Sequence, residues 1–282
     1  MRRLAVATVA FLTAAALPAT AHAALPPLPT VELPAVQLPN LQQEADRFLN
    51  TLPPEWGSSR PAPAAQPAQH PAQPAQSAAK TAPNCANCVA ITYDDGPSPL
   101  TNQLLDTLKS KNAHASFMVL APNATAHPEL LRRMQAEGHT IGNHTNTHRE
   151  LNKLAAGDVD GEIKAGAGAI KAATGQSPRW LRPPYGATNG TVDAAAKANG
   201  QAEAMWSVDT LDWKDRNSEH VCSAAVSGAQ PGGIILMHDI HATTVNAASC
   251  VIDGLRAKGL EPVSLDTLIP NPQPGKQYYS RS

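Results

Sequence analysis

The chain has 282 residues, with 22 lysines and arginines against 23 aspartates and glutamates, so its formal net charge at pH 7 is −1. A balance this close to neutral gives no electrostatic argument for binding nucleic acid. Beyond the first residues, no segment is long and apolar enough to span a membrane, which takes about 20 residues. We therefore expect neither a nucleic-acid partner nor a transmembrane segment.

Residues 1–23 have the pattern of a secretory signal peptide. Two arginines precede an apolar run from Leu4 to Leu17, and Ala21-His22-Ala23 offers a small-x-small cleavage site. The apolar run is too short for a spanning helix. The sequence predicts an exported chain that begins near Ala24.

Residues 24–84 are rich in proline, alanine and glutamine. Such a segment cannot bury enough apolar surface to fold alone, so we expect a disordered, partly polyproline linker, with one short helix possible at 41–52. It could tether a surface enzyme or serve only as an exported spacer.

Residues 85–270 have the size of a single domain, and residues 271–282 remain as a tail. Strand-like and helix-like apolar patterns alternate, which predicts parallel strands with crossover helices and hence an α/β fold. The expected strands cover residues 89–93, 115–120, 140–143, 179–181, 204–208, 234–237 and 261–264. The expected helices cover residues 100–111, 127–137, 158–173, 191–199, 218–228 and 245–258. An open sheet and an incomplete barrel both fit, and in both the loops after the strands build the site.

Four cysteines lie in this domain: Cys85, Cys88, Cys222 and Cys250. An even number in an exported chain favours two disulfides, with three possible connectivities. A zinc ribbon is the alternative, but the second pair lacks the close spacing of such a site. We prefer to pair Cys85 with Cys88 and Cys222 with Cys250, because the latter two lie in helices that flank one strand.

The first expected strand ends in two adjacent acids, Asp94 and Asp95, followed by Gly-Pro. Successive strand side chains point to opposite faces, so the two carboxylates start in different directions. One could hold a cation while the other stays free as a base. The alternative is an ordinary turn, for which these residue types are typical.

Two histidines, His144 and His148, follow the third expected strand. At i and i+4 they would lie on one face of a helical turn and reach one cation. With an acid from a neighbouring strand end they give three protein ligands and an open position, which is typical of a catalytic zinc site. The alternative is a pair of solvated surface histidines.

Three further strand ends carry polar residues. Arg182 begins a turn stiffened by two prolines and could pair with the acid that binds no metal, or simply form a surface ion pair. The segment from Trp206 to Trp213 adds two aspartates and two indole rings, which close a core or hold a sugar. His238 is either a core histidine or an acid opposite the aspartate pair.

These five motifs, in this order, resemble those of the polysaccharide deacetylase family, which carries the NodB homology domain and is also called carbohydrate esterase family 4. The matching residues are Asp94-Asp95, His144 to His148, Arg182 to Gly186, Asp212-Trp213 and Leu236-x-His238. The resemblance implies a distorted (β/α) barrel of about seven parallel strands. Tyr93 departs from the family, where phenylalanine is commoner, but this same-shape change lies outside the metal set.

The resemblance also implies residue roles. A divalent metal, zinc or alternatively cobalt or another ion, would be held by Asp95, His144 and His148. The catalytic set would comprise Asp94 as base, His238 as acid, Arg182 positioning Asp94, Asp212 orienting His238, and the backbone N–H of Tyr185 contacting the oxyanion. The substrate pocket would be lined by Trp213, Leu236 and Pro184.

The implied function is metal-dependent hydrolysis of N-acetyl groups on a cell-wall glycan, with peptidoglycan N-acetylglucosamine as the expected polysaccharide substrate. Chitooligosaccharides and acetylated xylan are alternatives that the same motifs admit. A non-catalytic glycan-binding module is the alternative from another class, whereas a metalloprotease is disfavoured because the chain has no His-Glu-x-x-His. We expect a secreted monomer, extracellular or associated with the cell wall.

Overall fold

The structure is a computed structural model that describes residues 85–281; the predicted signal peptide and linker lie outside the described residues. The strands of this part are β1 (Cys88–Asp94), β2 (Ser116–Val119), β3 (Thr140–Asn143), β4 (Trp180–Leu181), β5 (Ala202–Ala204), β6 (Val208–Asp209), β7 (Ile234–His238), β8 (Glu261–Val263) and β9 (Gln277–Tyr278). The helices are α2 (Thr101–Ser110), α3 (Ala121–Ala126), α4 (Pro128–Ala136), α5 (Ala156–Thr174), α6 (Gly190–Ala198), α7 (Asp212–Asp215), α8 (Ser218–Gly228), α9 (Ala242–Ala257) and α10 (Leu265–Leu268), with 3₁₀ turns η2 (Leu151–Lys153) and η3 (Pro184–Gly186). None of the helices in residues 85–281 is long and apolar enough to cross a membrane.

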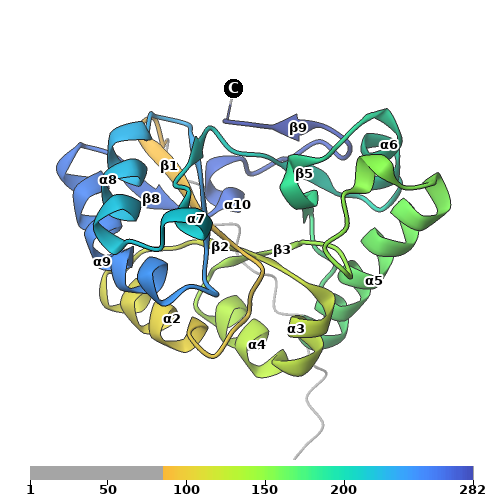
Figure 1. Cartoon of the computed structure of the whole chain (residues 1–282), viewed down its shortest axis with the longest axis horizontal. Helices are drawn as coiled ribbons and strands as arrows, with labels where there is room; N and C mark the ends of the chain where they lie inside the picture. The colour runs from red at the N-terminus through yellow and green to blue at the C-terminus, as the bar shows by residue number, and fades with distance from the viewer. Residues whose placement is uncertain (1–84, 282) are drawn as a thin grey trace, which may run out of the picture. The chain divides into compact units, whose positions relative to one another are not determined.

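One curled sheet organises the domain. Its strand order is β6-β7-β1-β2-β3-β4-β5-β9, with β8 beside the first residues of β1, and every strand ladder is parallel. Figure 1 shows the helices arranged around the outside of these strands. The distorted (β/α) barrel is confirmed, with nine strands in the described residues where the sequence predicted about seven.

The expected strand at 204–208 is two strands, with β6 at one end of the sheet order and β5 next to the last strand, β9, at the other. The backbone N–H of Met205 donates to Tyr278 O of β9 (2.9 Å), and that of Ser207 donates to Ile234 O of β7 (3.0 Å). The chain therefore passes from the β5–β9 side of the sheet to the β7 side between Met205 and Ser207, with Trp206 between them. An apolar run that changes pairing partner midway cannot be distinguished from one strand by its pattern alone.

The residues expected to form a tail contribute to the sheet. Strand β9 pairs with β5, and Ser280 then forms an antiparallel bridge to Gly233, just before β7. The backbone N–H of Arg281 donates to Gly232 O (2.8 Å). The C-terminal residues thus connect the last residues of β5 with the residue just before β7.

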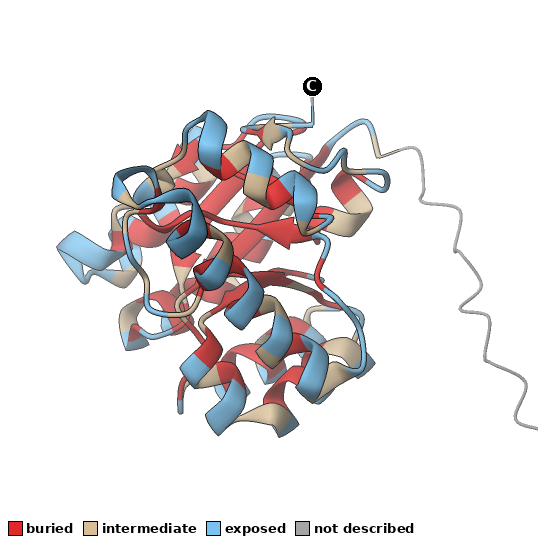
Figure 2. Ribbon diagram, turned by 90° about the vertical axis from the view of Figure 1, so that its right-hand side faces the viewer, coloured by how far each residue is buried: buried red, intermediate tan, exposed pale blue. Residues whose placement is uncertain are grey.

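The two faces of β1 explain where the site lies. Val89, Ile91 and Tyr93 point into the outer core beneath the helices, whereas Ala90 points into the apolar interior of the barrel. Farther along that inner face the buried residues become polar, first Thr92 and then Asp94. Figure 2 shows the same layering, with buried strands enclosed by helices whose outer faces are exposed. The apolar half fills the barrel, and the polar half opens at the carboxyl ends of the strands.

All six expected helices are confirmed to within a few residues, because apolar periodicity reports the buried face directly. In α2, for example, the buried residues Leu104, Leu105 and Leu108 lie on one face. Three short helices, α3, α7 and α10, were not expected. They have four to six residues each, too few for a periodic pattern.

Both predicted disulfides are present, Cys85 to Cys88 and Cys222 to Cys250, and no free cysteine remains in the described residues. The second joins α8 to α9 across a sequence separation of 28 residues. We expect that replacing Cys222 and Cys250 together by alanine lowers the free energy of unfolding by about 2–4 kcal/mol, because the cross-link restricts the unfolded chain. Urea unfolding monitored by circular dichroism measures this change.

The matched control replaces Cys85 and Cys88, whose sequence separation is only three residues. A short closed loop removes less entropy from the unfolded chain, so we expect a smaller loss of stability. A larger loss from the short loop than from the long one would contradict this explanation.

Candidate active site

The polar residues singled out in the sequence meet at one edge of the sheet. Asp94 ends β1 and is the register partner of His238, which ends β7. His144 follows β3 directly, and Arg182 follows β4. Because all these strands are parallel, their carboxyl ends lie together and bring the side chains into one site.

Asp94 and Asp95 face different partners. Asp94 is the last residue of β1 and is 3% exposed. Asp95 has a positive φ of 72°, a left-handed conformation that aspartate tolerates better than most residues. Its carbonyl oxygen accepts a hydrogen bond from Asn123 Nδ2 (2.7 Å). The change of backbone conformation explains how two adjacent carboxylates reach separate partners.

The segment from His144 to His148 is not the helical turn that its i, i+4 spacing predicted. Thr145 and His148 have positive φ values of 74° and 58°. The carboxylate of Glu162, on α5, accepts from the backbone N–H of Thr147 (2.8 Å) and of the preceding residue (3.1 Å), which replaces helical hydrogen bonds. The local prediction was wrong, yet the two imidazoles still meet, with ring centroids 4.9 Å apart.

Three possible metal ligands converge here: Asp95, His144 and His148, whose ligand atoms lie within 4.8 Å of one another. Asp95 Oδ1 is 3.4 Å from Nε2 of each histidine. This oxygen is buried and has no hydrogen-bond partner among the described residues. Ligands at about 2.0–2.2 Å from a tetrahedral ion are separated by about 3.4 Å. The spacing and the unpartnered oxygen both fit a divalent cation.

The outer ring nitrogens indicate which tautomer each histidine adopts. His144 Nδ1 lies 2.7 Å from the carbonyl oxygen of Arg182. A carbonyl only accepts, so Nδ1 carries the proton and Nε2 presents a lone pair toward Asp95. His148 Nδ1 lies 3.1 Å from the hydroxyl of Tyr185, which is compatible with the same tautomer. Metal-ligating histidines are typically held through their second nitrogen in this way.

Charge states around this site also suit a cation. Burial, followed by the charge of His144, lowers the pKa of His148, which favours the neutral imidazole that metals bind. Burial would raise the pKa of Asp95, but contact with His144 and the charges of His238 and His148 lower it to about 2. Asp95 is therefore an anion at neutral pH.

Asp94 forms a buried ion pair with Arg182. Arg182 Nη1 donates to Asp94 Oδ1 (2.6 Å), and the guanidinium is fully buried. Its other hydrogen bonds go to Thr92 Oγ1 (2.8 Å) and to the carbonyl oxygens of Ala204 (2.7 Å) and Met205 (3.2 Å). A buried arginine with this many partners is held rigidly, and it fixes one carboxylate oxygen of Asp94. The second oxygen, Oδ2, faces His144 at 3.7 Å.

His238 is held by Asp212, the fully buried first residue of α7. Asp212 Oδ1 is 2.8 Å from His238 Nδ1, while Oδ2 accepts from the backbone N–H of His238 (2.8 Å) and from Thr244 Oγ1 (2.7 Å). Burial lowers the pKa of His238, but the bond to Asp212 and the charges of Asp94, Asp212 and Asp95 raise it to about 9. The imidazole is a cation at neutral pH, and its second ring nitrogen, Nε2, is not the one that contacts Asp212.

A cavity of about 360 Å³ connects these groups, and its wall contains Asp94, Asp95, His144, His148, Pro183, Tyr185, Trp206, Asp209, Trp213, Leu236 and His238. Pro184 is not part of this wall; it is buried in η3, and Pro183 takes its place. Trp206 and Asp209 were not predicted as site residues, although their segment was noted. Trp206 lies in the crossing between β5 and β6 that the pattern hid.

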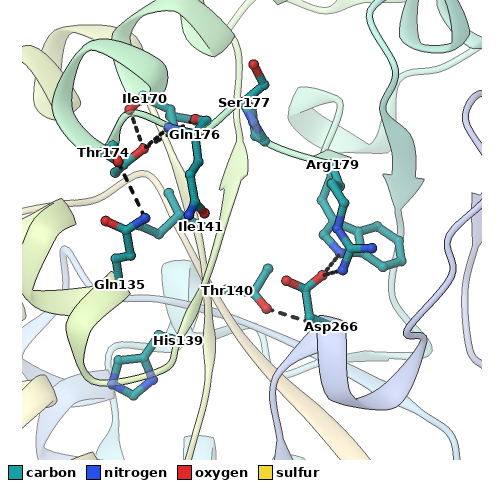
Figure 3. Close-up of a pocket in the computed structure, with 12 residues that line it drawn as sticks. Gln135, His139, Thr140, Ile141, Ile170, Thr174, Gln176, Ser177, Arg179 and Asp266 are labelled. Carbon is teal, nitrogen blue, oxygen red and sulfur yellow. Dashed lines mark hydrogen bonds and ion pairs between the residues drawn. The ribbon is translucent and has the colours of Figure 1, made fainter. Parts of the chain in front are cut away.

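A second cavity, of about 160 Å³, lies beside the first residues of β3 and β4, away from the catalytic edge. Figure 3 shows its lining, in which Arg179 reaches Asp266. Arg179 Nη2 donates to Asp266 Oδ1 (2.7 Å), and Trp180 Nε1 donates to the same oxygen (2.9 Å). The charged groups of this cavity thus pair with each other, and none of the residues of the five motifs contributes to its lining.

The model of the family described as polysaccharide deacetylase matches residues 81–204. A peptidoglycan-N-acetylglucosamine deacetylase, PgdA, of Listeria monocytogenes is 40% identical over 196 residues, which cover 69% of this chain and 41% of that protein. The chain therefore spans about two fifths of this relative's length. A chitooligosaccharide deacetylase of Bradyrhizobium sp. is 36% identical, with 61% of this chain and 86% of that protein covered.

Solved structures agree with this result. A structure described as T48 deacetylase with substrate superposes with a TM-score of 0.66 at 40% identity, covering 68% of this chain and 96% of that one. A family 4 carbohydrate esterase from Streptomyces lividans gives a TM-score of 0.61 at 35% identity, covering 63% and 92%. With the five motifs gathered at one edge of the same barrel, the chain belongs to the polysaccharide deacetylase family, carbohydrate esterase family 4.

Proposed function

We propose that this chain is a divalent-metal-dependent polysaccharide deacetylase that hydrolyses N-acetyl groups of peptidoglycan. The observation that carries the proposal is the convergence of Asp95, His144 and His148 on one point between two charged pairs, Asp94 with Arg182 and His238 with Asp212. A divalent ion held by these three ligands, with zinc our first choice, would polarise the acetyl carbonyl and lower the pKa of a water.

Asp94 is proposed as the general base. Its Oδ1 is occupied by Arg182, so Oδ2 is the oxygen available to remove a proton from the attacking water. The water oxygen bonds to the acetyl carbon, and the backbone N–H of Tyr185 is proposed to donate to the resulting oxyanion. Arg182 acts through Asp94 and is a positioning residue.

His238 is proposed as the general acid. Asp212 holds Nδ1, so Nε2 is the nitrogen that delivers a proton to the departing amine when the carbon–nitrogen bond breaks. The products are acetate and a free amino group on the sugar. Trp213 and Leu236 form apolar wall beside these groups and suit the acetyl methyl.

We expect Asp212→Asn to move the alkaline limb of the rate profile to lower pH. His238 must be protonated to act, so the rate falls as pH rises through its pKa. Asp212 helps to raise that pKa to about 9, and removing its negative charge lowers it again. A bound divalent cation would lower the pKa of His238 in the wild type and in Asp212→Asn alike, so the variant should still have the lower pKa. Initial rates across pH 5–10, at saturating metal, measure the shift.

Asp209→Asn is the matched control. Asp209 also lines the cavity, but its Oδ1 accepts from the backbone N–H of Leu211 (2.9 Å) and not from His238. This variant should keep the wild-type alkaline limb. If Asp209→Asn moved the limb and Asp212→Asn did not, the assignment of Asp212 as the partner of His238 would be wrong.

Peptidoglycan is the proposed substrate for three reasons. The sequence predicts export, a proline-rich tether precedes the domain, and relatives named for peptidoglycan deacetylation are 40% and 38% identical to this chain. The same considerations lead us to propose a secreted, wall-associated location, with residues 1–23 as signal peptide and 24–84 as linker. A chitooligosaccharide deacetylase at 36% identity makes chitin oligomers the second candidate.

Acetate release measured side by side on peptidoglycan, chitooligosaccharides and acetylxylan tests the substrate. We expect the highest kcat/KM on peptidoglycan. A higher value on chitooligosaccharides would transfer the proposal to that substrate. Acetate release from acetylxylan alone would mean that the chain is an esterase and that the proposal of an N-deacetylase is wrong.

A further inference from the structure

The two candidate metal-ligating histidines are secured differently. The side chain of His144 is 3% exposed, and its Nδ1 is held by the backbone carbonyl of Arg182. The side chain of His148 is 28% exposed. Its Nδ1 partner is a side chain, the hydroxyl of Tyr185 at 3.1 Å. His148 is therefore the ligand whose orientation depends most on a replaceable group.

Tyr185 contacts His148 in two ways. Besides the hydrogen bond, the two rings pack edge to face, with centroids 4.7 Å apart and an interplanar angle of 68°. The backbone N–H of His148 donates to Thr145 Oγ1 at 3.3 Å, a longer bond that does not involve the imidazole. The imidazole is thus packed between the ring of His144 on one side and Tyr185 of η3 on the other, and its Nδ1 is held from the η3 side.

The backbone of η3 fixes the direction in which the Tyr185 side chain leaves the chain. Tyr185 is 68% exposed, so its ring has few packing neighbours besides His148. Tyr185 has φ 61° and ψ 9°, and its turn is closed by a hydrogen bond from Gly186 N to Pro183 O (3.0 Å). A Cβ on Gly186 would lie 2.9 Å from the ring of Trp206. The turn is therefore held closely against Trp206, and its geometry directs the tyrosine toward His148.

We propose that the Tyr185 hydroxyl is a positioning group for the metal site, a role separate from that of its backbone N–H. This inference rests on the proposed metal site. His148 coordinates through Nε2 only if Nδ1 carries the proton, and Nδ1–H then donates to the phenol oxygen. The phenol holds the ring with Nε2 facing Asp95 Oδ1, 3.4 Å away. Loss of the hydroxyl frees a partly exposed ring to rotate, and metal affinity falls.

Tyr185→Phe tests this by removing one oxygen while keeping the ring and the backbone N–H. We expect zinc affinity, measured by titrating metal-stripped protein against a chelating dye, to fall by about 10–100-fold, as for other groups that orient a metal ligand. The visible absorption of the cobalt-loaded variant gives a second readout of ligand geometry.

Tyr279→Phe is the matched control, since Tyr279 is also exposed (52%) and, within residues 85–281, its hydroxyl donates only to Gln277 Oε1, at 3.4 Å. It should bind zinc as tightly as the wild type, and His148→Ala should bind far more weakly than either. If His148→Ala weakens zinc binding and Tyr185→Phe does not, the role of the hydroxyl is wrong while the metal site stands. If the wild type itself binds no zinc, both the metal site and this inference are wrong. Circular dichroism of each metal-free variant checks that it folds.

Discussion

Asp94→Asn is expected to lower kcat by about 10²- to 10⁴-fold, the usual contribution of a positioned general base. Asparagine has nearly the shape of aspartate and keeps an oxygen that can accept from Arg182 Nη1, which now lies 2.6 Å from Asp94 Oδ1. It cannot remove a proton from water. Asp94 is not among the three convergent ligands, so zinc affinity should stay close to the wild-type value. Steady-state acetate release and zinc titration measure the two quantities.

The buried ion pair complicates this experiment, because losing one partner of such a pair costs about 3–5 kcal/mol of stability. Wild-type zinc affinity in Asp94→Asn is therefore the check that the variant is folded. Asp95→Asn is the opposite control, since Asp95 Oδ1 is a candidate ligand and loss of the carboxylate's negative charge should weaken zinc binding. Undiminished turnover in Asp94→Asn would show that another group is the base.

His144→Ala should abolish metal binding and activity together. His144 is one of three candidate ligands. Its removal should therefore lower zinc affinity by more than the roughly 10- to 100-fold that is lost when a residue that only orients a ligand is removed. The loss also leaves the carbonyl of Arg182 without the donor now at 2.7 Å. Zinc titration and acetate release at a fixed metal concentration follow both effects.

His127→Ala provides the control, because His127 lies half-buried at the start of α4, outside the cavity wall, and pairs with Glu129 at 3.4 Å. It should match the wild type in both measurements. Retention of tight zinc binding in His144→Ala would mean that the ion is held elsewhere in the chain.

Much of the site could be predicted from the sequence because its reactive side chains lie at or just after the carboxyl ends of strands. Asp94 and His238 each terminate an apolar run, and parallel pairing brings such ends together whatever the detailed curvature of the sheet. The spacing of His144 and His148 suggested that both face one point. The two histidines do meet, but not on a helical turn as the spacing predicted. The loop that carries them is shaped by hydrogen bonds to the carboxylate of Glu162, at least fourteen residues farther along the chain.

Other features depend on contacts that no local pattern encodes. The split at Trp206 exists because its neighbours pair with β9 on one side and β7 on the other. Pro183 lines the cavity and Pro184 does not, and the two lie just before the positive-φ turn at Tyr185, which a run of two prolines does not reveal. Strand β9 is two residues long and is stabilised by pairing with β5, so its own sequence carries little signal.

Acetate release from N-acetylated peptidoglycan by the protein in three states, as prepared, stripped with a chelator, and reloaded with zinc, tests the central proposal most directly. We expect release by the first, loss in the second and recovery in the third, with none of these activities in His144→Ala. If saturating zinc or cobalt produced no acetate from peptidoglycan, chitooligosaccharides or acetylxylan, the proposal of a metal-dependent deacetylase would be wrong, and a glycan-binding module on this fold would replace it.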